Sequence, residues 1–309
     1  MAAGGGAIRP VRGAPGSVHD RRTMRHAVNV PNFGEYADPH VFVRLARETE
    51  AASWDGLFVW DHLLVDPAWG VPIADAWVLL AAAATVTERI RLGPMVTPLP
   101  RRRPWVVARQ AVTLDHLSRG RLTLGAGIGA PPDAEFGAFG EEMSAPVRAE
   151  KLEEALAILV GLWSGREFSW PGRHFQLGPM RFEPLPFQRP RIPIWLAGSW
   201  PKRRALRRAA RWDGLFPTSR HTDETGEPMP LDELAAILEV LRDARPDGSL
   251  DGYDVVVMGE SPADAASAAA LIGPYAAAGA TWWCETISGR RGSLDEMLAR
   301  VAVGPPVLG

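Results

Sequence analysis

The sequence predicts an α/β fold, a closed (β/α)₈ barrel of the TIM type. From Arg25 onward, short apolar runs rich in β-branched or aromatic residues alternate with segments whose apolar residues recur every three or four positions. The first pattern is typical of buried strands and the second of helices. Eight of each occur in strict alternation, and parallel strands joined by crossover helices in that number close into a barrel.

The expected elements follow in order along the chain. Strands are predicted at 26–30, 56–60, 90–97, 121–127, 193–198, 213–217, 253–258 and 281–285. Helices are predicted at 39–53, 74–87, 104–118, 147–163, 201–211, 231–243, 261–276 and 293–300. The helical period is clearest in the fourth helix, where one apolar stripe consists of Leu152, Leu156, Leu159 and Trp163. The fifth helix has Pro201 in its first turn, where a missing N–H costs nothing.

The domain organisation follows from composition along the chain. Residues 1–23 are rich in Gly, Ala, Pro and Arg and cannot bury enough apolar surface to fold, so we expect a disordered tail or an extension upstream of a start at Met24. Residues 24–309 then form a single barrel domain. Between the fourth helix and the fifth strand, about 164–192, we expect a short insertion with a hairpin around Pro171-Gly172.

Overall composition excludes several classes of protein. The net charge of −2 comes from 34 basic and 36 acidic residues without long blocks of one sign, so we expect neither nucleic acid nor a membrane as a partner. Cys284 is the single cysteine, which excludes an intramolecular disulfide and fits a reducing compartment. The chain has no run of about 18 apolar residues that could span a membrane. We therefore expect a cytoplasmic protein.

Asp61-His62 is the first candidate for chemistry. The apolar run 57–60 delivers the pair to the end of a strand, and in a barrel of this type the C-terminal strand ends form the active site. His62 is a candidate acid or base, with Asp61 beside it to fix its tautomer. The competing interpretations are a histidine bonded to a rim carbonyl and an aspartate that caps a loop. Glu285, at the end of the last strand, is expected to be structural.

A metal site is not expected. The histidines are scattered along the chain, and only His62 and His221 lie near predicted strand ends. A hydrolase barrel needs several ligands that converge on one ion.

Two glycine-containing segments are candidate cofactor sites. Gly125 and Gly127 nominally match a dinucleotide fingerprint, but Pro131-Pro132 follows where that motif needs a helix, so the Rossmann interpretation fails. These glycines either let a flat or phosphorylated ligand approach the backbone or form a tight turn. Gly198 and Ser199 end the fifth strand just before Lys202, where backbone amides, a hydroxyl and a positive charge would hold a phosphate. The alternative makes Ser199 a simple helix cap.

The chain also resembles the bacterial luciferase-like monooxygenase family from about Arg25 to the last strand. The resemblance lies in an ordered set of segments: Asp75-Ala-Trp-Val-Leu-Leu80, Thr87-Glu-Arg-Ile-Arg-Leu-Gly93-Pro-Met-Val-Thr97, Arg103-Pro104, Leu114-Asp-His-Leu-Ser118-Arg-Gly-Arg121, Leu124-Gly-Ala-Gly127, Leu162-Trp163-Ser-Gly165, Pro193-Ile-Trp-Leu-Ala-Gly198 and Ala210-Arg-Trp-Asp213-Gly214.

The resemblance implies a flavin-dependent oxidoreductase that acts on a small organic substrate. The cofactor would be reduced FMN, which activates oxygen and can come from a separate flavin reductase, or the reduced deazaflavin coenzyme F420, which transfers a hydride. The resemblance also allows a homodimer. The alternative is a flavin-binding barrel without catalysis.

The resemblance further implies roles for single residues. A bulge with a non-proline cis peptide would fall at Met95-Val96, with Thr97 following, and would support the flavin ring. Asp61-His62 matches the pair at the reactive edge of the ring. Some FMN-dependent members have an arginine where Ile128 stands, so the phosphate would be held by Ser199, Lys202 and Arg148 instead.

Overall fold

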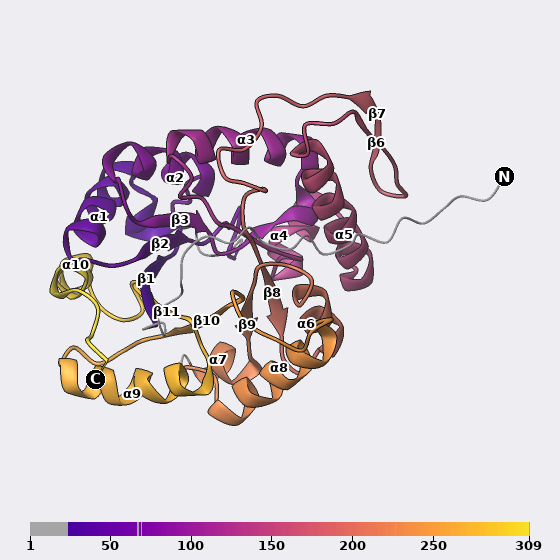
Figure 1. The fold of residues 1–309 in the computed structure, drawn as a ribbon. Helices are drawn as coiled ribbons and strands as arrows, with labels where there is room; N and C mark the ends of the chain where they lie inside the picture. The colour runs from indigo at the N-terminus through magenta and orange to yellow at the C-terminus, as the bar shows by residue number, and fades with distance from the viewer. Residues whose placement is uncertain (1–23, 67, 69, 226, 309) are drawn as a thin grey trace.

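The computed structural model describes residues 24–66, 68, 70–225 and 227–308. Nine of its strands form one parallel sheet in the order β3-β2-β1-β11-β10-β9-β8-β5-β4, and helices surround this sheet (Figure 1). The strands are β1 (Arg25–Val30), β2 (Gly56–Val59), β3 (Arg91–Pro94), β4 (Thr97–Pro98), β5 (Leu124–Gly127), β8 (Ile194–Ser199), β9 (Gly214–Thr218), β10 (Asp254–Gly259) and β11 (Trp282–Thr286). The predicted (β/α)₈ barrel is confirmed.

The barrel closes through its third strand, which the structure divides into β3 and β4. A cis peptide joins Met95 to Val96 between the two halves, at the predicted position. β4 pairs with β5 through Thr97 opposite Ala126, and an isolated bridge joins Leu92 to Leu122. The bulge therefore sits inside a continuous ring of strands.

The main helices agree with the predicted ones to within a few residues at each end. They are α1 (Pro39–Ala51), α2 (Ala76–Val86), α3 (Pro104–Leu117), α5 (Ala145–Leu162), α6 (Arg203–Ala209), α8 (Leu231–Ala244), α9 (Ala265–Ala278) and α10 (Leu294–Val303). Side-chain caps fix several starts: Asp38 accepts from the second residue of α1, and Ser293 and Glu296 form a capping box at α10. None of the described helices is long and apolar enough to cross a membrane.

Short elements at the strand ends were not predicted. They are η1 (Gly34–Ala37), η2 (Leu99–Arg101), α4 (Pro132–Glu135), η3 (Gly137–Phe139) and α7 (Arg220–Thr225). All of them follow the C-terminal end of a strand, so they belong to the loops that build the functional end of a barrel.

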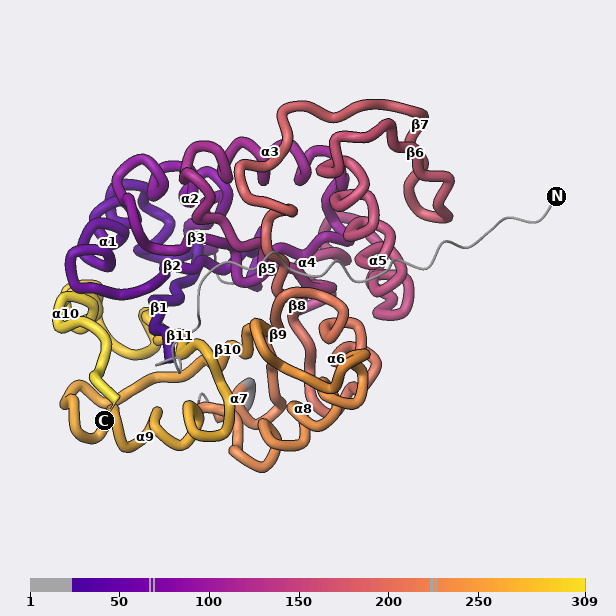
Figure 2. Tube along the Cα trace, viewed as in Figure 1, coloured from indigo at the N-terminus to yellow at the C-terminus, as the bar shows by residue number. Residues whose placement is uncertain are grey.

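The predicted insertion is a hairpin of β6 (Phe168–Pro171) and β7 (Gln176–Met180), which projects beyond α5 (Figure 2). Glu154 on α5 fastens its turn. The carboxylate accepts hydrogen bonds from the backbone N–H groups of Arg173, His174 and Phe175 at 2.9–3.2 Å, and from the indole of Trp170 at 3.3 Å. This half-buried carboxylate thus helps to fasten the hairpin to α5.

Side chains alternate between the two faces of each strand, as a barrel requires. Ala27, Phe58, Met95, Trp195, Phe216, Val256, Trp282 and Cys284 form the buried interior cluster. Val28 and Val30 on β1 belong instead to the larger cluster between strands and helices. Aromatic rings therefore fill the barrel below its mouth.

Arg121 and Asp115, within the segments that carry the family resemblance, stabilise the fold. Arg121 donates to the carbonyl oxygens of Ala84 and Thr87 at the C-terminal end of α2 and to that of Ile90. Buried Asp115 accepts from the backbone and side chain of Gln188. Both lie away from the C-terminal strand ends, where such residues serve stability.

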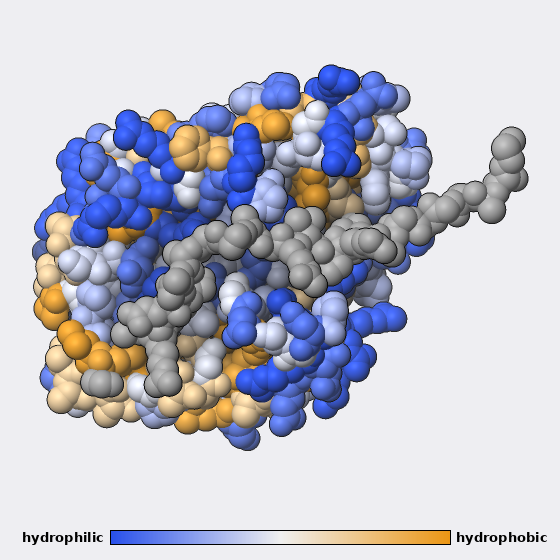
Figure 3. All heavy atoms as spheres, in the orientation of Figure 1, coloured by the Kyte–Doolittle hydropathy of each residue, from blue (hydrophilic) through white to orange (hydrophobic). Residues whose placement is uncertain are grey.

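The surface visible in this orientation is mostly hydrophilic (Figure 3), as expected for a chain with similar numbers of acidic and basic residues. Hydrophilic residues cover most of the face in Figure 3, and hydrophobic residues form separate groups, one of them over the alanine-rich α9. Scattered groups of this kind are ordinary on folded proteins.

Candidate active site

His62 lies at the mouth of the barrel, three residues after β2 ends. Its backbone is held by Asn32: the side-chain amide of Asn32 donates to the His62 carbonyl at 2.8 Å and accepts from its N–H at 3.2 Å. The imidazole packs among aromatic rings, with Phe33 and Trp60 at centroid distances of 5.9 and 6.0 Å. The side chain of His62 is 22% exposed, so one edge of the ring reaches the mouth.

Glu135 on α4 binds the imidazole. Its Oε1 atom lies 2.8 Å from Nδ1 of His62, and its side chain is fully buried. The same carboxylate accepts from the backbone N–H groups of Leu63 and Leu64 and forms an ion pair with Arg101. A carboxylate that is surrounded by donors only accepts hydrogen bonds. Nδ1 of His62 therefore carries the proton, and Nε2 presents a lone pair.

Burial lowers the pKa of His62 to about 4; the positive charge of Arg101 adds to this effect and Asp61 opposes it. The negative charge of Glu135 is already balanced by its ion pair with Arg101. A histidine with this pKa is neutral at pH 7. His62 can therefore accept a proton or a hydrogen bond through Nε2 at neutral pH.

Asp61 does not orient the imidazole, which corrects the sequence-based expectation. Its carboxylate is buried and accepts from the Thr97 hydroxyl at 2.8 Å, from Arg101 at 3.0 Å and from Arg102 at 2.8 and 2.9 Å. Asp61 and His62 are neighbours in sequence, but their side chains serve different partners. Asp61 anchors the arginines that follow the bulge, and Arg101 links it to Glu135.

Thr97 also differs from its expected role in binding a cofactor. Its hydroxyl donates to Asp61 and accepts from the indole N–H of Trp77 at 3.0 Å. The side chain is fully buried. The Thr97 hydroxyl thus belongs to the network that supports the bulge and does not face the mouth.

Met95, Val96 and Gly127 occupy the part of the mouth predicted for a flat ring. Met95 belongs to the buried interior, and Val96 packs over it with part of its side chain exposed. A Cβ atom at Gly127 would lie 2.9 Å from Cγ2 of Val96 and 3.3 Å from Cβ of Ala197. The absence of that atom leaves a shallow cradle between small side chains at the edge of the bulge.

Gly125 and Gly198 have structural explanations, and their contact with a ligand stays a prediction. A Cβ atom at Gly125 would lie 2.1 Å from the carbonyl oxygen of Pro94, so glycine lets β5 approach β3. At Gly198 it would lie 2.9 Å from Leu215 and 3.1 Å from Leu206, which pack between strand and helix. In both places a larger residue would collide with the barrel itself.

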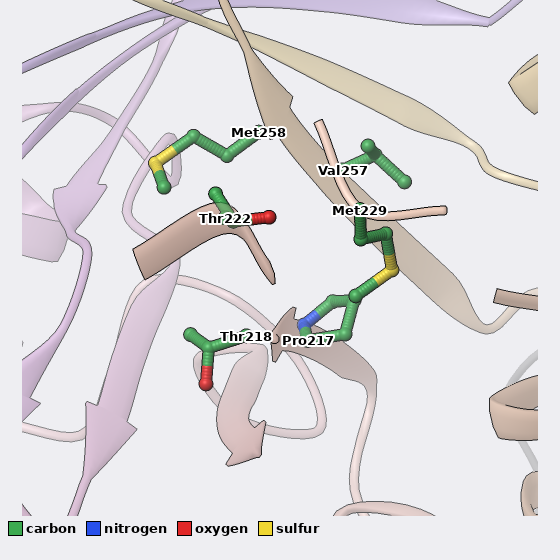
Figure 4. A pocket seen from close by; sticks show the side chains of 6 residues that line it. All are labelled: Pro217, Thr218, Thr222, Met229, Val257 and Met258. Carbon is green, nitrogen blue, oxygen red and sulfur yellow. The ribbon is translucent and has the colours of Figure 1, made fainter. Parts of the chain in front are cut away.

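Ser199 and Lys202 lie where a phosphate group was predicted. The Ser199 hydroxyl is 2.8 Å from that of Thr218 at the end of β9, and Lys202 is exposed. A cavity of about 20 Å³ adjoins this hydroxyl pair and is lined by Pro217, Thr218, Thr222, Met229, Val257 and Met258 (Figure 4). This volume suits a single water molecule.

Arg148 and Glu285 are engaged in structural contacts. Arg148 donates to the carbonyl oxygens of Ile128 and Gly129 at 3.0 and 2.6 Å, and its guanidinium lies over the Phe136 ring. It braces the loop after β5 and does not point to a phosphate site. Glu285 is fully buried and accepts from Trp283 at 2.8 Å and from the N–H of Ser261 at 3.0 Å. Its expected structural role agrees with these contacts.

Sequence reasoning missed Glu135, Arg101 and Thr218. Glu135 lies 73 positions from His62, in the loop after β5, and only barrel closure brings the two together. The signal available was an acidic residue between the apolar residues Ala134 and Phe136, in a loop rich in glycine and proline. In the described part of the chain, acidic, histidine and cysteine side chains form no group that could hold a metal ion.

The chain is similar in sequence to known proteins. An uncharacterized protein of Mycobacterium tuberculosis is 34% identical over 221 residues, which cover 65% of this chain and 71% of that protein. The 4-hydroxyprotoasukamycin monooxygenase of Streptomyces nodosus subsp. asukaensis is 38% identical over 122 residues, 38% of this chain and 33% of that enzyme.

Two solved structures share the fold. Monooxygenase RslO1 from Streptomyces bottropensis superposes with a TM-score of 0.74 at 20% identity and covers 91% of this chain and 97% of its own. An F420-dependent secondary alcohol dehydrogenase, solved with an F420-acetone adduct, also has a TM-score of 0.74, at 17% identity, and covers 92% and 99%. The model of the luciferase-like monooxygenase family matches residues 19–292. The chain therefore belongs to the luciferase-like monooxygenase family and is an oxidoreductase of that class.

Proposed function

We propose that this chain binds a reduced flavin, FMN or coenzyme F420, at the barrel mouth and uses His62 to move a proton while a small organic substrate reacts. The observation that carries the proposal is the cradle formed by Val96, Gly127 and Ala197 beside the strand that bears His62. A flat ring needs a surface of small side chains to rest against. A methyl group added at Gly127 would disturb this surface. Family membership supports the choice of a flavin.

The residues around the cradle fit such a cofactor. Val96 follows the bulge, and the backbone N–H of Met95 is bonded to Val59 of β2 at 2.7 Å, so the bulge and the strand that leads to His62 are adjacent. The hydroxyls of Ser199 and Thr218 and the charge of Lys202 suit a phosphate group on the side of the mouth formed by β8 and β9. The protein then supplies position and electrostatics, and the cofactor supplies the transfer of a hydride or the activation of oxygen.

His62 supports proton transfer in its neutral form. Glu135 holds the proton on Nδ1, so Nε2 accepts a hydrogen bond from the ring edge or from a polar group of the substrate. Phe33 and Trp60 pack against the imidazole ring and against each other. Arg101 forms ion pairs with both Asp61 and Glu135 and so holds Glu135 in place.

The relatives support both cofactors. One solved neighbour is an F420-dependent dehydrogenase, and another is the oxygenating constituent of 3,6-diketocamphane monooxygenase in complex with FMN. The contacts of Arg148 with Ile128 and Gly129 leave FMN without an arginine in this loop, which favours weak FMN retention. In the FMN case a separate reductase supplies the reduced cofactor.

The test separates catalysis from binding alone. Purified protein is titrated with FMN and with F420, and the oxidation of each reduced cofactor is followed with a panel of small ketones, without oxygen for F420 and with oxygen for FMN. We expect micromolar affinity for one cofactor and substrate-dependent turnover. His62→Ala should bind that cofactor within a modest factor and turn over at least ~100-fold more slowly. Binding without turnover in the native protein would support a non-catalytic flavin-binding barrel, and binding of neither cofactor would refute the proposal.

A further inference from the structure

Asn29 is a buried amide that has no adequate partner in the described part of the chain. It lies on the inward face of β1, between the outward residues Val28 and Val30 and one layer above Ala27 of the interior cluster. Its side chain is fully buried. Nδ2 has the sulfur of Met258 as a partner at 3.4 Å, and Oδ1 has none among the described residues. Turning the amide over only exchanges the two ends, because a thioether is a weak acceptor and no donor.

Most buried polar groups are hydrogen-bonded, since an unpaired one costs free energy comparable to a lost hydrogen bond. Asn32, three residues later, shows the contrast. Its amide is also fully buried, yet it donates to the carbonyls of His62 and Ala74 and accepts from the N–H of His62. The protein thus provides hydrogen-bond partners for the Asn32 amide but no adequate partner for the Asn29 amide among the described residues.

The position of Asn29 separates it from the ring cradle. Around the barrel the strands follow the order β1, β2, β3 with β4, β5, β8, β9, β10 and β11. Met258 on β10 therefore lies across the barrel from the bulge, and Asn29 is on β1, beside the strand that leads to His62. A ring that rests against Val96 and Gly127 turns its other face toward Asn29 and Met258. That face is where a substrate must lie to react.

We infer that Asn29 is a specificity-determining residue that binds an uncharged substrate group carrying an O–H or N–H. This inference rests on the proposed function. The free Oδ1 needs a donor from the ligand, and the amide carries no charge to hold an anion. Met258 is partly exposed and flexible, so it can move aside and leave the amide in contact with the ligand. The O–H or N–H of the substrate then donates to Oδ1 of Asn29.

The test compares two probes of similar shape, benzyl alcohol and ethylbenzene, which differ by a hydroxyl in place of a methyl group. The wild type is first titrated with FMN and F420, which tests the proposed function separately. The loaded protein is then titrated with each probe by ligand-observed NMR. We expect a preference for benzyl alcohol in the wild type that Asn29→Leu reduces by about 5- to 100-fold. An unchanged preference, or no binding of either probe by the loaded wild type, would overturn the inference.

Two further measurements show whether Asn29 contacts the substrate, contacts the cofactor or only stabilises the fold. Asn29→Leu should leave cofactor affinity unchanged, and a loss of affinity would place the amide on the cofactor and contradict the assignment to the substrate. In the ligand-free protein Asn29→Leu should raise the Tm by about 2–4 °C, because it removes an unpaired amide. The matched variant Asn32→Leu should lower the Tm. A fall in Tm for Asn29→Leu as well would identify Asn29 as a structural amide.

Discussion

At the scale of single residues, the site depends on which carboxylate reaches the imidazole. Asp61 is adjacent to His62 in sequence, yet Glu135 makes the contact at 2.8 Å. Successive residues at a strand end point in different directions, so sequence proximity predicts side-chain contact poorly. The sequence could place His62 at the mouth, but it could not identify a partner that is brought in by a loop two strands away.

Glu135→Ala tests this partnership. Without the carboxylate, Nδ1 loses its acceptor, and the imidazole proton should redistribute from Nδ1 to Nε2. We expect the ¹⁵N shifts of His62 to report this change and turnover to fall by ~10²–10⁴, as when a base is held in the wrong tautomer. Asp133→Ala, an exposed acid in the same short helix, is the control. An unchanged tautomer would show that the contact with Glu135 does not set it.

The lowered pKa of His62 predicts a specific dependence of stability on pH. In the unfolded chain the imidazole binds a proton near pH 6.5, whereas in the folded protein it does so near pH 4. Between these values the unfolded state binds more protons, so stability falls as the pH falls. From pH 7 to pH 5 the wild type should lose about 2 kcal/mol more than His62→Gln, measured by urea denaturation. Equal losses in the two proteins would contradict the pKa of about 4.

At the scale of elements, the sequence predicted strands and helices well and the connections poorly. The helix stripe from Leu152 to Leu159 and the strand run 57–60 each carry a period that local geometry dictates. The short elements α4, η2 and α7 have no such period, and their positions depend on tertiary contacts. Arg101 in η2, for example, is fixed by Asp61 and Glu135. The site residues that were missed lie in these connections or at the end of a neighbouring strand.

The hydroxyl pair at the ends of β8 and β9 gives a prediction for cofactor binding. Ser199→Ala should weaken the affinity for the phosphate-bearing cofactor by ~10- to 100-fold, because it removes a hydrogen bond to a charged group. Thr218→Val should act on the same group, so the double variant should lose less than the product of the two effects. Fluorescence titration measures each affinity. Affinities that match the wild type would move phosphate recognition away from these strands.

At the scale of the whole molecule, the closed barrel accounts for the arrangement of the site. Residues on β1, β5, β8 and β10, and residues that follow β2 and β3, meet at one mouth although they span the chain from Asn29 to Met258. Closure depends on the close approach of β3 and β5, which Gly93 and Gly125 permit. The sequence predicted this architecture from the count of elements. It could not predict which glycines serve closure and which leave space for a ligand.

The N-terminal segment 1–23 lies outside the described residues, and its prediction stands on composition. It has no periodic apolar face that could pack on the barrel. A chain that begins at Met24 should therefore keep the Tm and the cofactor affinity of the full-length protein. A fall of several degrees in the Tm, measured by calorimetry on the two proteins side by side, would show that the segment contributes to the fold.

The central claim is that the mouth of this barrel binds a flavin ring against Val96, Gly127 and Ala197. The most direct measurement is the affinity of Gly127→Ala for the cofactor that the wild type binds, with Gly178→Ala in the hairpin as control, since a Cβ atom there would meet nothing within 4 Å. We predict a loss of at least ~10-fold for Gly127→Ala, since the added methyl group fills the cradle, and none for the control. Wild-type affinity in a folded Gly127→Ala protein would show that the ring binds elsewhere.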